Sequence, residues 1–169
     1  MFTTMSELAE IPLQRDMDAT FPAELQRLVE AGKRRSRQIN CFDFVSSDPE
    51  HIWRSLAALP RGTFCEWGSG IGIMTGIASW LGYQATGIEL NEELAAASRQ
   101  LLVEHELHCD IRQGSYFDIH VEADYYFVYC WPGKQNEVEQ HFLVSTPPQA
   151  RLLICHGAAD LRCKVRSRT

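Results

Sequence analysis

Short apolar runs alternate with longer amphipathic stretches over most of the chain. The apolar runs have the length of buried strands, and the amphipathic stretches repeat apolar residues three and four positions apart, as helices do. Strands that alternate with helices of this length predict an α/β fold with a mainly parallel sheet and helices on both faces. The predicted strands are 63–66, 84–88, 109–113, 123–130 and 150–155, and the predicted helices are 23–38, 51–59, 73–81, 92–105 and 134–143.

The two ends of the chain depart from this alternation. Residues 1–22 have mixed polarity and no sustained period, so we expect a loose arm with at most a short helical turn. Together with the first predicted helix they form an N-terminal arm (1–40), which precedes one domain (41–169). After the last predicted strand, residues 158–169 have room for at most one further strand.

Local signals mark one helix start and one irregular connection. Ser47 and Glu50 have the spacing of a capping box, and Pro49 falls in the first turn, where its missing N–H costs little. The connection between 109–113 and 123–130 is too short for a full crossover helix, so we expect it to be irregular.

Composition excludes several classes of protein. A net charge of −6 argues against a broad nucleic-acid surface, since phosphate binding needs a basic face. The start of the chain lacks the features of a signal peptide, and no apolar run approaches the ~20 residues that span a bilayer. We therefore expect a cytoplasmic protein without a membrane segment. The six cysteines include no Cys-x-x-Cys pair, so we expect no metal site and thiols that act as small buried hydrophobes.

A glycine-rich loop follows the first predicted strand of the sheet. Residues 66–72 read Glu-x-Gly-x-Gly-x-Gly, and a helix is predicted directly after them. Glycines allow positive φ and close approach of a ligand, and the helix start offers unpaired N–H groups. A dinucleotide-binding fingerprint needs Gly-x-Gly-x-x-Gly, but here the third glycine, Gly72, comes one residue early. An NAD-binding oxidoreductase is therefore the less favoured alternative.

Polar or aromatic side chains follow all five predicted strands. Because ligands bind beyond the carboxyl ends of parallel strands, these residues predict one site at that edge of the sheet. Glu89, which ends the second strand, can accept two hydrogen bonds from vicinal ribose hydroxyls. The five residues at strand ends are Glu66, Glu89, Ser115, Trp131 and His156.

The glycine loop together with Glu89 resembles the cofactor site of the class I S-adenosylmethionine-dependent methyltransferases. The resemblance spans 42–157 and implies a Rossmann-like fold, S-adenosylmethionine as cofactor and S-adenosylhomocysteine as product. The segment 42–49 resembles the entry segment of small bacterial members related to protein-lysine methyltransferases, which makes Phe44 and Ser47 candidate lid residues. The alternative is that Phe42 and Phe44 only anchor the arm to the sheet. The cofactor-binding residues that the resemblance implies are Phe44, Ser47, Glu66, Gly68, Ser69, Gly70, Gly72, Glu89, Leu90, Ser115 and Tyr116.

Two positions depart from the pattern of that family. The acid that often holds the adenine amino group is replaced by 114–116 (Gly-Ser-Tyr). Ser115 can hydrogen-bond to adenine, and Tyr116 or Phe117 can stack on it. The Asn/Asp-Pro-Pro-aromatic sequence of enzymes that methylate amide or adenine nitrogens is replaced by 129–133, which argues against those acceptors. Tyr129 and Trp131 can instead form an aromatic wall around a lysine amine or a small-molecule nitrogen or oxygen. A Trp-Pro turn that only packs at the sheet edge is the alternative.

The sequence therefore predicts a methyltransferase that acts on a protein lysine or a small-molecule N or O acceptor. His156 is the candidate base, although a lone histidine at a strand end is also common as a structural residue. A non-catalytic module that binds the cofactor or a partner is the rival interpretation, because fold alone does not establish catalysis. The resemblance also implies a C-terminal antiparallel hairpin that this chain is too short to complete, and the uncovered edge would favour a homodimer.

Overall fold

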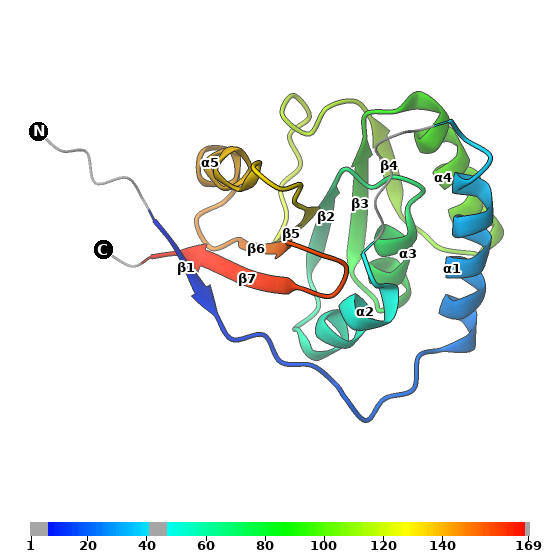
Figure 1. The fold of residues 1–169 in the computed structure, drawn as a ribbon, viewed down its shortest axis with the longest axis horizontal. Coiled ribbons are helices and arrows are strands. Elements are labelled where there is room, and N and C mark those ends of the chain that lie inside the picture. The colour runs from blue at the N-terminus through cyan, green and yellow to red at the C-terminus, as the bar shows by residue number, and fades with distance from the viewer. Residues whose placement is uncertain (1–6, 41–46, 168–169) are drawn as a thin grey trace, which may run out of the picture.

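One mixed sheet of seven strands forms the centre of the computed structural model, which describes residues 7–40 and 47–167 (Figure 1). The strand order is β1-β7-β6-β5-β2-β3-β4. Strands β2 to β6 are mutually parallel, whereas β7 is antiparallel to β6 and β1 is antiparallel to β7. The five predicted strands are confirmed with small shifts at their ends. The strands are β1 (Leu8–Ile11), β2 (Thr63–Trp67), β3 (Gln84–Glu89), β4 (Asp110–Gln113), β5 (Tyr125–Tyr129), β6 (Arg151–Cys155) and β7 (Leu161–Arg166).

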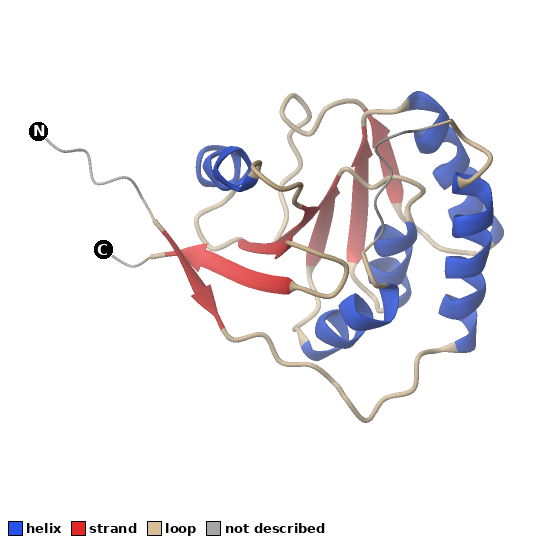
Figure 2. Ribbon diagram, viewed as in Figure 1, coloured by secondary structure: helices blue, strands red, loops and turns tan. Residues whose placement is uncertain are grey.

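Helices cover both faces of this sheet, as the sequence predicted (Figure 2). Apolar residues of α1 to α4 share one buried cluster with one face of the sheet. Val138 and Phe142 of α5 belong to a second cluster on the opposite face. Among the described residues, no helix is long and apolar enough to cross a membrane. The helices are α1 (Ala23–Ser36), α2 (Pro49–Ala58), α3 (Ile73–Trp80), α4 (Glu92–Glu104) and α5 (Gln135–Ser145).

The N-terminal segment was expected to be a loose arm, and this expectation is wrong for Leu8–Ile11. These residues form strand β1, which pairs with β7 in the register Leu8↔Arg166 to Ile11↔Cys163. The strand has only four residues and its partner lies at the other end of the chain, so no local pattern reveals it. A single strand follows β6, as predicted, and the seventh strand of the sheet comes from the N-terminal segment. A domain boundary at residue 40 and a homodimer both stay predictions. The strand at the outer edge of the sheet next to β7 is β1.

Helix α2 begins at a different residue from the one that the capping-box spacing indicated. Asp48 is the N-cap, and its Oδ1 accepts a hydrogen bond from the His51 N–H at 3.1 Å. Glu50 is the second residue of the helix and not the third, where a capping box with this N-cap would need it. Its carboxylate instead accepts a hydrogen bond from the Arg54 guanidinium at 2.8 Å. The capping prediction was therefore one residue early, while Pro49 does occupy the first position of the helix.

The strand order reverses between β2 and β5. The chain proceeds from β2 outward to β4 and then returns to the other side of β2 to form β5. The returning segment, 114–124, contains no helix, which confirms the predicted irregular connection. The carboxyl ends of β2 and β5 diverge at this reversal, and such a point is where open α/β sheets bind ligands.

Candidate functional site

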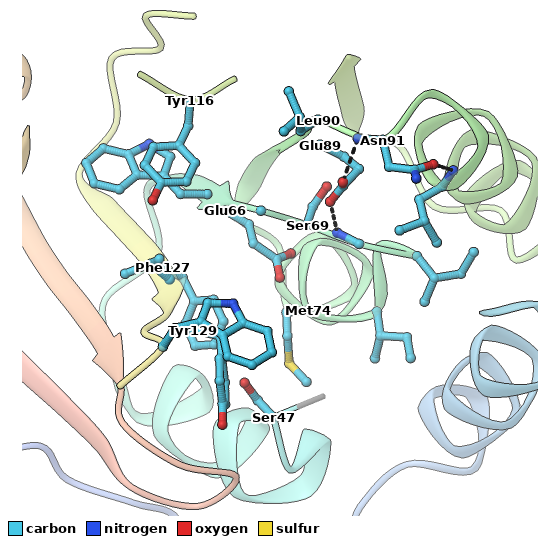
Figure 3. A pocket seen from close by; sticks show the side chains of 18 residues that line it. Ser47, Glu66, Ser69, Met74, Glu89, Leu90, Asn91, Tyr116, Phe127 and Tyr129 are labelled. Carbon is cyan, nitrogen blue, oxygen red and sulfur yellow. Dashed lines mark hydrogen bonds between the residues drawn. The ribbon is translucent and has the colours of Figure 1, made fainter. Parts of the chain in front are cut away.

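A cavity of about 400 Å³ lies at the carboxyl ends of the central strands (Figure 3). In Figure 3, Tyr116 and the segment from Glu89 to Asn91 lie at one end of it, and Ser47 and Tyr129 lie at the other. Glu66 lies between the two ends. The predicted site residues that line this cavity are Ser47, Glu66, Gly68, Ser69, Gly70, Glu89, Leu90, Tyr116, Tyr129 and Trp131.

The glycine loop presents backbone to the cavity. The N–H groups of Gly68 and Ser69 both donate to the Ile88 carbonyl at 2.9 Å, which fixes the loop to β3. Gly68 has φ 76°, and a Cβ placed on it would meet nothing within 4 Å. The Ser69 Oγ is buried and has no hydrogen-bond partner within the described parts of the chain. The open backbone at Gly68 suits the close approach of a polar ligand in this cavity.

Gly72 is not among the cavity residues and has a packing role. It is the N-cap of α3, with φ 89°. A Cβ at this position would lie 3.1 Å from the Ser98 Cβ and 3.3 Å from the Leu102 Cδ1, both on α4. The glycine therefore allows α3 and α4 to approach each other, and a contact between Gly72 and a cofactor stays a prediction.

Glu89 is held rigidly at the end of β3. Its side chain is 8 % exposed. Oε2 accepts a hydrogen bond from the Gly70 N–H at 2.6 Å, and Oε1 accepts one from the Asn91 N–H at 2.8 Å. Asn91 in turn caps α4, because its Oδ1 accepts from the Leu94 N–H at 3.0 Å. Each carboxylate oxygen keeps a lone pair for a further donor, so the acid is preorganised to accept hydrogen bonds from a ligand.

Glu66 is a buried acid in the middle of the cavity wall. Its Oε2 accepts a hydrogen bond from the Thr75 Oγ1 at 2.6 Å, which joins β2 to α3. Burial raises the pKa of Glu66 to about 8, against the opposing effect of the Thr75 hydrogen bonds, and the charge of Glu89 adds to the rise. Glu66 is therefore mainly protonated at neutral pH. Of the two roles expected for it, the structure shows the bracing one, while a contact with a ligand stays a prediction.

Two aromatic residues form the end of the cavity opposite Tyr116. The rings of Tyr129 and Trp131 meet edge to face, with centroids 6.0 Å apart and planes at 78°. Trp131 is 42 % exposed, so this wall opens to solvent. Ser47 and Met74 line the same cavity and lie near Tyr129 in Figure 3. The cavity is thus polar near the glycine loop and apolar where it opens.

Two further predicted residues, Ser115 and His156, do not line the cavity. The Ser115 Oγ accepts from the Phe117 N–H at 3.2 Å and caps a turn outside the cavity lining. His156 lies between β6 and β7, also outside the lining, where its backbone N–H donates to the Asp160 carbonyl at 2.9 Å. Burial, Arg162 and Lys164 lower the pKa of His156. Phe44 lies outside the described residues.

Several residues of the lining were not predicted from the sequence. Asn91 comes two residues after Glu89, and Trp67 comes directly after Glu66. The position of both next to predicted site residues was a usable signal. The others are apolar residues of the sheet and its helices, whose orientation depends on tertiary packing. The lining residues missed from the sequence are Trp67, Ile71, Ile73, Met74, Asn91, Leu94, Phe127 and Val128.

Comparison with known proteins shows similarity in structure but not in sequence. No family model and no curated protein matches the chain. A methyltransferase from Geobacter sulfurreducens superposes with a TM-score of 0.68 at 11% identity, over 89% of this chain and 93% of that one. The S-adenosylhomocysteine-bound methyltransferase PaMTH1 from Podospora anserina gives 0.63 at 15% identity, over 82% and 64% of the two chains. An O-methyltransferase from Bacillus cereus in complex with S-adenosylhomocysteine gives 0.62 at 13% identity, over 82% and 68%.

Other similar structures are much longer than the matched region. The chain spans 49% of the PH0226 protein from Pyrococcus horikoshii and 42% of the mitomycin 7-O-methyltransferase MmcR. At these identities the similarity concerns the fold. The chain has the Rossmann-like fold of the class I methyltransferases, as its glycine loop and Glu89 indicated.

Proposed function

We propose that this chain is an S-adenosylmethionine-dependent methyltransferase. The observation that carries the proposal is a single cavity in which the open side of Gly68 and the fixed carboxylate of Glu89 meet. S-adenosylmethionine, when bound, supplies a methyl group that its sulfonium has already activated. The structures of similar fold with bound S-adenosylhomocysteine support the same assignment of the ligand.

The residues divide the cavity by chemistry. We assign the acceptance of the ribose hydroxyls to Glu89, because both of its oxygens are oriented and keep free lone pairs. The backbone of Gly68 to Gly70 and the carboxyl group of Glu66 suit the amino-acid portion of the cofactor. A ligand ammonium next to Glu66 would favour the ionised form of that acid. We assign contact with the purine of the cofactor to Tyr116 and Leu90.

Methyl transfer requires little of the protein besides alignment. Holding the acceptor in line with the methyl group supplies most of the acceleration, and a base is needed only if the acceptor must first lose a proton. We assign the acceptor end to Tyr129 and Trp131, whose rings can surround an amine or an apolar small molecule. His156 does not line the cavity, so its role as a base stays a prediction.

The lining also supports a choice between acceptor classes. The described residues that line the cavity include no lysine, arginine or histidine, so nothing there favours a phosphate-bearing acceptor. We propose a protein lysine or a small-molecule nitrogen or oxygen as the acceptor. The acceptor assignment is tested by incubating the protein with S-adenosylmethionine labelled in its methyl group and a cell lysate from which nucleic acid has been removed. We expect label in protein or in small molecules, with none in a parallel reaction on the recovered nucleic acid.

The rival function is a non-catalytic module that binds the cofactor. It is favoured because His156, the base expected from the sequence, does not line the cavity. Binding of S-adenosylhomocysteine without transfer of label to any lysate fraction would support this module and contradict the enzyme. Matched reactions with Tyr129→Ala and Trp131→Ala test the acceptor wall, because they should reduce transfer while cofactor affinity stays within about threefold.

A further inference from the structure

The end of the cavity at Tyr116 is formed by a connection between strands that contains no helix. Tyr116 lies in the segment 114–124 between β4 and β5, yet its ring lines the cavity. It stacks on Trp67 of β2, with centroids 5.1 Å apart and planes within 4°. Trp67 is 3 % exposed and belongs to a central strand. Tyr116 therefore rests on a rigid surface, but stacking alone leaves the rest of its segment unrestrained.

His141 of α5 adds a restraint on the backbone of Tyr116 itself. Its Nε2 lies 3.0 Å from the Tyr116 carbonyl oxygen, a distance at which the imidazole N–H donates. The same imidazole contacts Trp67 and Phe117, each with centroids 4.8 Å apart. Burial lowers the pKa of His141, against the opposing hydrogen bond to Tyr116, so the ring is neutral at pH 7 and carries its proton on Nε2.

Helix α5 is itself well anchored, so His141 can transmit a fixed position. The neighbouring Phe142 is fully buried against the sheet. Arg166 of β7 donates from Nη2 to the Phe142 and Leu143 carbonyls, both at 3.0 Å, and its guanidinium lies 4.9 Å from the centre of the Phe142 ring. The contacts thus run from the sheet through α5 and His141 to Tyr116.

We propose that His141 is a positioning residue, which holds the Tyr116 ring in place so that aromatic stacking recognises the purine of the cofactor without a dedicated carboxylate. The proposal rests on the methyltransferase function proposed above. Asp118, the nearest acid after β4, does not line the cavity, and the Ser115 hydroxyl caps a turn. Every purine offers a π-face, so an aromatic ring that Trp67 and Phe117 hold in place needs no hydrogen bond to the base.

Two substitutions separate the hydrogen bond of His141 from its bulk. His141→Phe keeps a ring in the cluster but removes the donor, whereas the amide of His141→Gln can still donate to the Tyr116 carbonyl. Calorimetry should show S-adenosylhomocysteine affinity reduced about tenfold in His141→Phe and restored to within about threefold in His141→Gln. His105→Gln, at the end of α4, is the matched control and should bind like wild type.

The choice of ligand locates the effect within the cavity. 5′-Methylthioadenosine carries the purine and ribose but lacks the amino-acid portion. His141→Phe should reduce its affinity by the same factor as that of S-adenosylhomocysteine. A loss confined to S-adenosylhomocysteine would place the effect at the other end of the cavity and overturn the proposal.

A double-mutant cycle with Tyr116→Ala tests whether His141 acts through Tyr116. The single change should reduce affinity roughly 5- to 150-fold, the range of base–aromatic stacking. In the Tyr116→Ala background, His141→Phe should then have no further effect. Additive losses, or wild-type affinity in His141→Phe with unchanged circular dichroism, would overturn the positioning role alone. Failure of the wild-type chain to bind either ligand would overturn the proposed function and this role with it.

Discussion

Replacement of Glu66 by glutamine should stabilise the protein, and the gain should grow with pH. The substitution keeps the shape of the side chain and an acceptor oxygen for the Thr75 hydroxyl, but it removes the ionisable group. Burial raises the Glu66 pKa from 4.5 to about 8. Between these values the folded state holds a proton that the unfolded chain has released. Wild-type stability therefore has its full Glu66 contribution below pH 4.5 and loses it as the pH rises to about 8.

The size of this effect follows from the two pKa values. Each pH unit across the interval corresponds to about 1.4 kcal/mol, so the loss reaches roughly 3 kcal/mol at pH 7 and roughly 5 kcal/mol above pH 8. Glu66→Gln should escape this loss. The difference in unfolding free energy between the variant and wild type should thus widen from pH 4.5 to pH 8 and stay constant above pH 8.

Urea denaturation of both proteins at intervals between pH 4.5 and 9 measures this difference. The comparison cancels every other titrating group, and Glu92→Gln, an exposed acid at the start of α4, controls for the loss of a surface charge. A difference that does not change with pH would refute the reasoning. A variant that becomes less stable than wild type towards alkaline pH would also refute it, because Glu66 would then be a stabilised carboxylate. S-adenosylhomocysteine affinity should fall in the same variant if Glu66 faces the ligand ammonium.

Three further predictions concern Glu89, the glycine loop at Gly68, and the histidines His51 and His156. Glu89→Gln should lose about 1–3 kcal/mol of stability, since an amide cannot accept from both backbone N–H groups, and should bind S-adenosylhomocysteine at least ~10-fold more weakly by calorimetry. Gly68→Ala and Gly82→Ala should each cost about 1–2 kcal/mol because both glycines have positive φ, but only Gly68→Ala, inside the cavity, should weaken binding. Burial lowers the pKa of His51 and of His156 below 6.5, so the unfolded chain takes up protons first and stability should fall as the pH drops below 6.5. His156→Gln should flatten the urea-measured dependence between pH 5 and 7, and an unchanged slope would contradict this assignment.

The parts of the fold that the sequence predicted are those with a strong local signal. The strand β5 is a continuous apolar and aromatic run, and the loop from Glu66 to Gly72 combines a strand end, glycines and a helix start within a few residues. Glu89 follows from the next strand in the same way. Each of these features depends on neighbours in the sequence, so its pattern survives without knowledge of the tertiary structure.

The features that escaped prediction depend on distant partners or on single-residue offsets. Strand β1 forms because it pairs with β7, and the sequence of a four-residue segment does not predict this pairing. Asp48 and Ser47 are both good capping residues. The choice between them depends on a distant contact, because the backbone N–H of Asp48 donates to the Ala158 carbonyl at 2.6 Å. His141 contacts Tyr116 because of the orientation in which α5 packs on the sheet. The spacing of apolar residues in the helix does not specify this orientation.

The central claim is that the cavity beside Gly68 and Glu89 binds the methyl-donor cofactor. Titration calorimetry of the wild-type chain tests this most directly, with S-adenosylmethionine, S-adenosylhomocysteine and NADH as separate ligands. Saturable one-to-one binding of the first two ligands and no heat from NADH is the predicted result. Binding of NADH, or of none of the three, would contradict the account.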